Sequence, residues 1–126
     1  MILVDTSVWI DYFRGGEHTE ILDHLIRMDL VCVNEIILTE LFPALHHRNQ
    51  KELINALQAL PCIPYEIFWE GIRLFQNLNL KNGINKVGLP DLMILQHCID
   101  CNLELWSLDK HFMLMSKSVS LKLFER

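Results

Sequence analysis

Short apolar runs alternate with longer amphipathic stretches along this chain. The runs at 2–4, 30–33 and 103–106 are rich in apolar residues and have no helical period, which predicts buried strands. Two prolines in the extended segment 61–64 indicate an edge strand at most, because proline cannot donate to a sheet. Apolar and polar residues alternate over 118–123, which favours a fifth strand.

The longer stretches repeat apolar residues every three or four positions. In 17–28, Ile21, Leu22 and Leu25 fall on one face, which predicts a helix with one buried side. Asn34 suits the start of a later helix, which Pro43 is expected to kink. The predicted helices lie at 6–13, 17–28, 35–45, 51–60, 65–80 and 90–101, with a short one around 112–113, and 81–88 is expected to be a loop. Strands alternating with helices predict an α/β fold, with a mostly parallel sheet of about five strands and helices on both faces.

Composition limits the function classes that fit. The chain has 126 residues, which suits one domain, and no apolar stretch long enough to span a membrane. It begins Met-Ile-Leu-Val-Asp, without a basic leader, so a cytoplasmic protein whose four cysteines are free thiols is expected. The net charge of −5 argues against nucleic-acid binding by electrostatics alone. That objection weakens if several acidic residues bind metal ions.

Four of the acidic residues lie in apolar surroundings. Asp5 ends the first predicted strand and Asp109 lies just beyond the fourth, and ligands of parallel sheets bind at such carboxyl ends. Glu40 and Asp91 lie in apolar helical sequence, where a carboxylate is costly unless it is paired, hydrogen-bonded or metal-bound. Oxygen ligands suit Mg²⁺ or Mn²⁺. Taken singly, each acid also fits a helix cap, a first-turn position or a solvated surface.

Other chemistries have weaker support. The pair Cys98 and Cys101 lacks the second pair that a structural zinc site usually has. A receiver-like binding module needs paired acids after its first strand, whereas Asp5 is followed by Thr6. Lys86 and Lys110 flank the third and fourth acids and are possible RNA phosphate contacts, although ordinary solvated lysines fit equally well.

Four motifs containing these acids together resemble the PIN-domain ribonucleases, specifically the VapC-like toxins of type II toxin–antitoxin pairs. The segment 5–11 (DTSVWID) resembles the N-terminal motif, and 39–41 (TEL) resembles the second acidic motif. The segments 88–94 (GLPDLMI) and 107–112 (SLDKHF) resemble the third and fourth. Their order and spacing span almost the whole chain, so the resemblance implies a single PIN-like nuclease domain over residues 1–126 with a three-layer α/β/α sandwich.

The resemblance also implies a mechanism and a set of site residues. It implies a metal-dependent endoribonuclease that uses Mg²⁺ or Mn²⁺ to hydrolyse RNA phosphodiester bonds, with a carboxylate-bound ion that activates water. Asp5 and Asp91 would be the principal metal ligands, Glu40 would complete the site, and Asp109 would be the most peripheral of the four catalytic acids. Hydroxyl groups that orient these carboxylates are expected from the serines of the first and fourth motifs, Ser7 and Ser107.

Partners follow from the same resemblance. It implies a cognate antitoxin protein, a homodimer and a structured RNA substrate such as a tRNA or rRNA loop. The helices at 17–28 and 35–60 are the candidate interfaces, because their apolar stripes exceed what a small core must bury. A non-catalytic α/β binding module, receiver-like or a partner-binding PIN domain, is the alternative. A purely structural partner protein also stays open, and it would tolerate Asp5→Asn or Asp91→Asn with no loss beyond stability.

Overall fold

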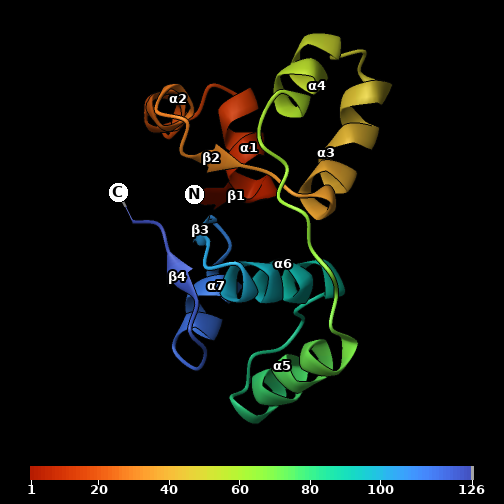
Figure 1. Ribbon diagram of the computed structural model, residues 1–126, viewed down its shortest axis with the longest axis vertical. Coiled ribbons are helices and arrows are strands. Elements are labelled where there is room, and N and C mark those ends of the chain that lie inside the picture. The colour runs from red at the N-terminus through yellow and green to blue at the C-terminus, as the bar shows by residue number, and fades with distance from the viewer. Residues whose placement is uncertain (126) are drawn as a thin grey trace.

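Four parallel strands form the centre of the structure, a computed structural model that describes residues 1–125 (Figure 1). The strands are β1 (Ile2–Val4), β2 (Val31–Cys32), β3 (Glu104–Trp106) and β4 (Lys122–Leu123). They lie in the order β2-β1-β3-β4. Leu3 of β1 is opposite Cys32 on one side and Leu105 on the other. The order brings the ends of β1 and β3 together, although about 100 residues separate them in the chain.

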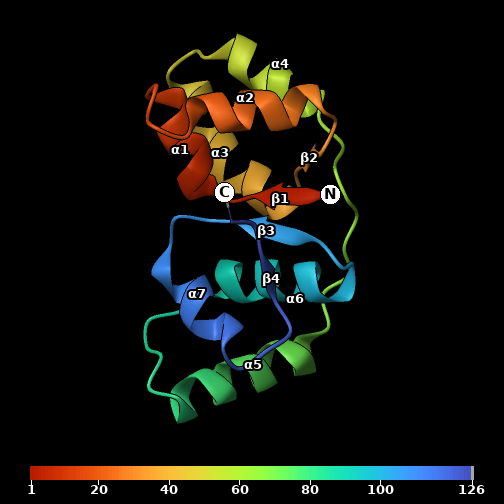
Figure 2. The same ribbon diagram turned by 90° about the vertical axis from the view of Figure 1, so that its left-hand side faces the viewer.

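Helices cover both faces of this sheet, as the two ribbon views show (Figure 2). One layer contains the N-terminal helices, which are α1 (Thr6–Phe13), α2 (Thr19–Arg27), α3 (Glu35–His47) and α4 (Lys51–Gln58). The other layer contains the later helices, which are α5 (Trp69–Lys81), α6 (Leu89–Asp100) and α7 (Lys110–Ser116). The predicted three-layer α/β/α arrangement with a parallel sheet is therefore confirmed.

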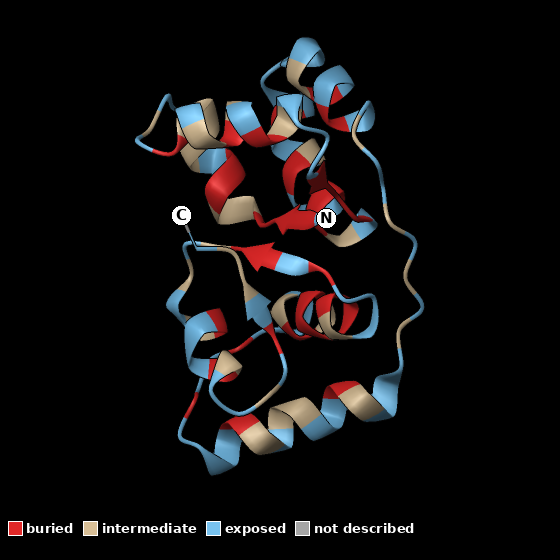
Figure 3. Cartoon of the chain, turned by 60° about the vertical axis from the view of Figure 1, so that its left-hand side comes forward, coloured by how far each residue is buried: buried red, intermediate tan, exposed pale blue. Residues whose placement is uncertain are grey.

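The core lies between the sheet and the helices that face it. Leu3, Val4 and Leu105 are fully buried, and Figure 3 shows the strand next to the N-terminus, β1, as buried along its whole length. The second helical layer contributes Phe112 of α7 and Ile94 of α6 to this core, with exposed fractions of 1% and 0%. Strands buried on both faces need continuous apolar sequence, which is why β1 consists entirely of aliphatic residues.

The sheet has four strands rather than about five. The segment 61–64 forms only an isolated parallel bridge between Val33 and Cys62. The Val33 amide donates to the Pro61 carbonyl at 2.9 Å, and the Ile63 amide donates to the Val33 carbonyl at 2.9 Å. Pro61 and Pro64 have no N–H to extend this ladder, so pairing stops after one bridge. The expected strand at 118–123 is present only as the two residues of β4.

The helix predicted from residue 65 begins later, at Trp69. A clamp formed by Gln96 of α6 holds the preceding segment extended. Its Nε2 donates to the Phe68 carbonyl at 2.9 Å, and its Oε1 accepts from the Phe68 amide at 3.0 Å and from the Tyr65 hydroxyl. The Phe68 amide, which an earlier helical turn would need, is thereby bonded to Gln96, so helix formation starts after it.

Three smaller predictions concern α3, the cysteines and the membrane. Asn34 is the N-cap of α3, since its Oδ1 accepts from the Ile37 amide at 2.9 Å, and Pro43 lies inside the uninterrupted helix. The four cysteines are free thiols, with Cys32 and Cys98 buried. Within residues 1–125, no helix combines the length and apolar character needed to cross a membrane.

Candidate metal centre

Asp5 anchors the site at the carboxyl end of β1. Its backbone amide donates to the Trp106 carbonyl of β3 at 2.9 Å, so the two strand ends are held together at this residue. The residue is only 6% exposed. Its Oδ2 accepts hydrogen bonds from the hydroxyls of Ser7 at 2.9 Å and Ser107 at 2.7 Å. The side chain makes no capping bond to α1, so helix capping does not explain this buried carboxylate.

The same two serines connect Asp5 to the loop that carries Asp109. The Ser7 Oγ accepts from the Leu108 amide at 2.9 Å, and the Ser107 Oγ accepts from the Asp109 amide at 3.0 Å. Each hydroxyl therefore donates to Asp5 and accepts from the 108–109 backbone. The two hydroxyls thus hold the Asp5 carboxylate and the backbone of the 108–109 loop together, and their part in orienting metal ligands stays a prediction.

Asp109, Asp91 and His111 form a tight group beside Asp5. One possible ligand atom from each lies within 4.8 Å of the other two, and all three side chains are partly exposed. Asp109 is also the N-cap of α7, because its Oδ1 accepts from the His111 amide at 2.9 Å. The His111 Nδ1 is 3.2 Å from the same oxygen. A capping role for Asp109 is thus real, and it leaves the second carboxylate oxygen available to a cation.

The four acids influence one another electrostatically, and Asp91 shows this most clearly. Its pKa is raised from the ordinary value of 3.8 to about 6. Burial is the largest cause, followed by the charges of Asp109, Asp5 and Glu40, while His111 opposes the shift. The Asp91 carboxylate accepts no hydrogen bond from any residue within 1–125. It therefore enters the cluster as the least compensated negative charge.

Glu40 reaches the centre from α3. Its Oε1 accepts a hydrogen bond from the Thr6 hydroxyl at 2.9 Å, which links α3 to the start of α1. Burial raises the pKa of Glu40, the Thr6 hydrogen bond lowers it, and the nearby Asp5 charge raises it. Thr6 was not among the residues predicted from the sequence, although its position directly after Asp5 offered a signal.

The donor set fits a divalent cation. Close carboxylates repel one another, and a bound cation would remove that repulsion while using oxygen ligands suited to Mg²⁺ or Mn²⁺. His111 of the 107–112 motif adds a possible nitrogen ligand, and it was not among the site residues predicted from the sequence. Asp109, expected to be the most peripheral acid, lies beside Asp91 instead. All four acids predicted from the sequence approach one edge of the sheet.

Lys86 and Lys110 lie near the third and fourth acids in sequence. Lys86 is exposed in the loop before α6 and has a positive φ of 64°, which an L residue adopts only in tight turns. Lys110 is exposed as the first residue of α7. Exposure leaves both ammonium groups free to meet a phosphate, and their contact with RNA stays a prediction.

The three-layer fold and its carboxyl-edge acidic cluster define a small α/β protein with a candidate divalent-metal centre. A model of the PIN domain family matches residues 2–117. The chain therefore belongs to the PIN domain family. No curated protein sequence matches it at the level of whole-sequence similarity.

Solved structures agree with this assignment at the level of the fold. A chain of the DNA-bound VapBC from Salmonella typhimurium superposes with a TM-score of 0.76 at 18% identity, covering 98% of this chain and 96% of that one. VapBC2 from Rickettsia felis, bound to a DNA fragment from its promoter, gives 0.76 at 20% identity, covering 98% of both chains. VapBC-1 from nontypeable Haemophilus influenzae gives 0.75 at 18% identity, covering 99% and 98%.

Proposed function

We propose that this PIN-domain protein is a Mg²⁺- or Mn²⁺-dependent endoribonuclease and the toxin of a toxin–antitoxin pair. The observation that carries the proposal is the convergence of Asp5, Glu40 and Asp109 on Asp91, whose pKa all three raise. Gathering four carboxylates at one point, with Asp5 buried and Asp91 and Asp109 partly buried, is unfavourable in a purely structural protein, and a divalent cation would relieve the repulsion. The non-catalytic alternative leaves this cluster without a purpose.

Each acid has a role that its surroundings suit. A bound divalent ion would supply an activated water and stabilise negative charge on the phosphate under attack. Asp5, held by two serine hydroxyls, and Asp91 would be the main ligands, with Asp109 and His111 completing the group. Glu40, whose pKa burial raises, is suited to accept a proton from water.

Cleavage of RNA tests the proposal directly. Total RNA incubated with the protein should be cut in Mg²⁺ or Mn²⁺ and remain intact with a chelator. Asp5→Asn should abolish cleavage, whereas Glu66→Gln, an exposed carboxylate in the 61–68 segment, should retain it. Equal cleavage by the Asp5→Asn and unsubstituted proteins would disprove the mechanism, and so would cleavage that ignores the chelator.

The proposal includes partners and location. One of the similar structures is a toxin–antitoxin complex, which supports a cognate antitoxin, and a cytoplasmic homodimer acting on a tRNA or rRNA is proposed with it. The 17–28 and 35–60 helices remain the predicted interfaces. Large exposed apolar side chains lie mainly elsewhere, on and around α5 to α7: Phe68, Trp69, Leu74, Leu80, Leu89, Leu108, Met113 and Leu114. A monomeric mass at micromolar concentration would contradict the dimer, and crosslinking through α3 or through α5 would distinguish the two layers.

A further inference from the structure

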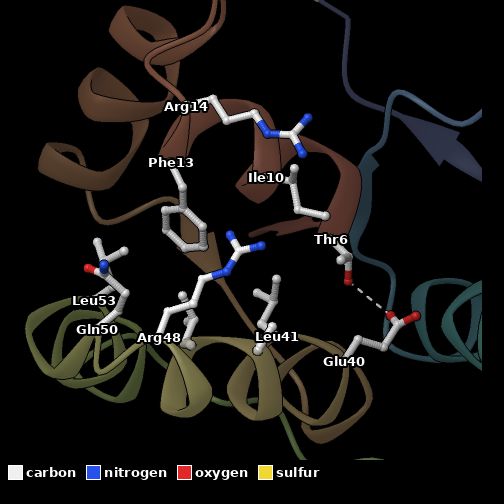
Figure 4. Close-up of a pocket in the computed structure, with 11 residues that line it drawn as sticks. Thr6, Ile10, Phe13, Arg14, Glu40, Leu41, Arg48, Gln50 and Leu53 are labelled. Atoms are coloured by element: carbon white, nitrogen blue, oxygen red, sulfur yellow. Dashed lines mark hydrogen bonds between the residues drawn. The ribbon is translucent and has the colours of Figure 1, made fainter.

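A groove of about 330 Å³ lies beside the metal centre, between α1, α3 and α4. Thr6 and Glu40 form the end that meets the centre, and a dashed line marks their hydrogen bond in Figure 4. Much of the remaining lining is apolar: Ile10, Phe13, Leu41, Ala44, Leu45 and Leu53. The groove is therefore a continuous surface that begins at one of the catalytic acids and leads away from it.

Two arginines, Arg14 and Arg48, also line this groove. Each directly follows a helix, Arg14 after α1 and Arg48 after α3. The carbonyl groups at a helix C-terminus favour nearby cations, which explains why arginine suits both positions. It does not explain why side chains from two different helices line one groove, Arg14 from the α1 side and Arg48 from the α3 side (Figure 4).

The groove lacks a negative charge to match them. Among its lining residues, all within the described part of the chain, Glu40 is the single acid, and it lies at the Thr6 end. Neither guanidinium forms a salt bridge within residues 1–125. Two like charges beside one groove repel each other, and an anion bound between them would remove that repulsion. The charge pattern thus favours an anionic occupant in a chain whose net charge is −5.

We propose that this Arg14/Arg48 groove binds the RNA nucleotide next to the one being cleaved, an inference that rests on the proposed ribonuclease function. Guanidinium groups bind phosphate oxygens through paired hydrogen bonds. Phe13 and the aliphatic lining offer a surface for an unpaired base, and the Gln50 amide offers donors and an acceptor to its edge. A strand with one phosphate at the carboxylate centre would continue past Glu40 into this groove.

Binding of a short RNA tests the inference without depending on cleavage. The probe is a fluorescein-labelled, 12-nucleotide single-stranded RNA of random sequence, followed by anisotropy between about 50 and 200 mM salt in an Asp91→Asn background. Arg14→Gln with Arg48→Gln should weaken binding about tenfold or more, and should flatten the slope of log affinity against log salt by about 0.7 for each phosphate that is no longer neutralised. Arg14→Lys with Arg48→Lys should restore most of the slope.

The matched control removes the same charge elsewhere. Arg73→Gln with Lys81→Gln changes two exposed cations of α5, in the opposite helical layer, and should leave affinity and slope close to those of the parent. Equal affinity and equal slope for the two glutamine pairs would overturn the inference. So would a parent protein that does not bind the probe. Thermal unfolding of every variant verifies that the comparison is made between folded proteins.

An acidic protein segment could also pair with two arginines, and a second probe separates this case. If the Arg14/Arg48 glutamine pair loses binding of a polyglutamate peptide but retains RNA affinity, the groove is a protein-docking surface and the inference is wrong. Its failure is distinct from failure of the proposed function. If the protein cleaves RNA with metal but binds RNA independently of these arginines, the proposed function stands and the groove inference is wrong. If it binds RNA through the arginines but shows no metal-dependent cleavage, the groove inference stands and the proposed function is wrong.

Discussion

Replacing Asp91 by asparagine should stabilise the metal-free protein, although the same change should abolish catalysis. Burial and three neighbouring carboxylates raise the pKa of Asp91 from 3.8 to about 6. The folded protein therefore binds more protons than the unfolded chain between these two values. Its free energy of unfolding falls as the pH rises through that window, and the full cost is present above pH 6.

The size of the effect follows from the same shift. A shift of about two pKa units corresponds to about 3 kcal/mol, and because Asp91 is only half-buried, solvent screening reduces this to about 1–1.5 kcal/mol. For a domain of this length, that gain raises the melting temperature by roughly 3–6 °C. The gain should fall to about half at pH 5, where Asp91 is largely protonated in the folded state.

Thermal unfolding in chelator measures this at pH 7.5 and pH 5. Glu66→Gln is the control, because it removes an exposed carboxylate outside the cluster and should shift the melting temperature little at either pH. Excess Mn²⁺ should instead make the parent melt at a higher temperature than the variant. At a hundred times the dissociation constant the ion stabilises the parent by about 2.7 kcal/mol, and the Asp91→Asn variant much less. If the Asp91→Asn variant has a melting temperature equal to or below that of the parent in chelator at pH 7.5, the four carboxylates do not repel one another as argued.

Three further predictions concern the surroundings of the centre. Ser7→Ala and Ser107→Ala each remove one hydroxyl donor from Asp5, so RNA cleavage rates should fall about 10–100-fold while the melting temperature changes little. Asn34→Ala removes both the N-cap of α3 and the partner of the His97 Nδ1 at 2.9 Å, and should cost about 2–3 kcal/mol in urea unfolding. Burial lowers the pKa of His97 below 6.5, so the unfolded chain binds a proton at a higher pH than the folded protein does. The free energy of unfolding in urea should therefore decline as the pH falls below 6.5, and His97→Gln should lessen this decline.

Much of the fold follows from local sequence pattern. The aliphatic run ending at Asp5 predicted β1, and helical spacing predicted the helices within a few residues at most ends. The late start of α5 was not predictable, because Gln96, about 30 residues away, holds Phe68 extended. The segment 61–64 does not form a strand of the sheet because of its two prolines, which the sequence shows, although only the structure shows that one bridge remains.

The candidate site was predictable in its acids and less so in its connections. Asp5 and Asp109 follow strands whose carboxyl ends must meet in a parallel sheet, so their proximity follows from topology. The hydrogen bond from Thr6 to Glu40 and the grouping of His111 with Asp91 depend on side-chain directions that no spacing rule supplies. The pairing of Arg14 with Arg48 was equally hidden, because the two residues are 34 positions apart and belong to different helices.

The strand order carries a consequence for how this protein is made on the ribosome. β1 is central, but its neighbour β3 is synthesised about a hundred residues later, and Asp5 acquires the Ser107 hydroxyl only then. A nascent chain therefore holds only Asp5 and Glu40 of the centre until the segment with Asp91 and Asp109 has emerged. Such distant pairing also makes folding comparatively slow. The proposed nuclease activity would therefore arise only late in synthesis, after the segment carrying Ser107 and Asp109 has joined β1.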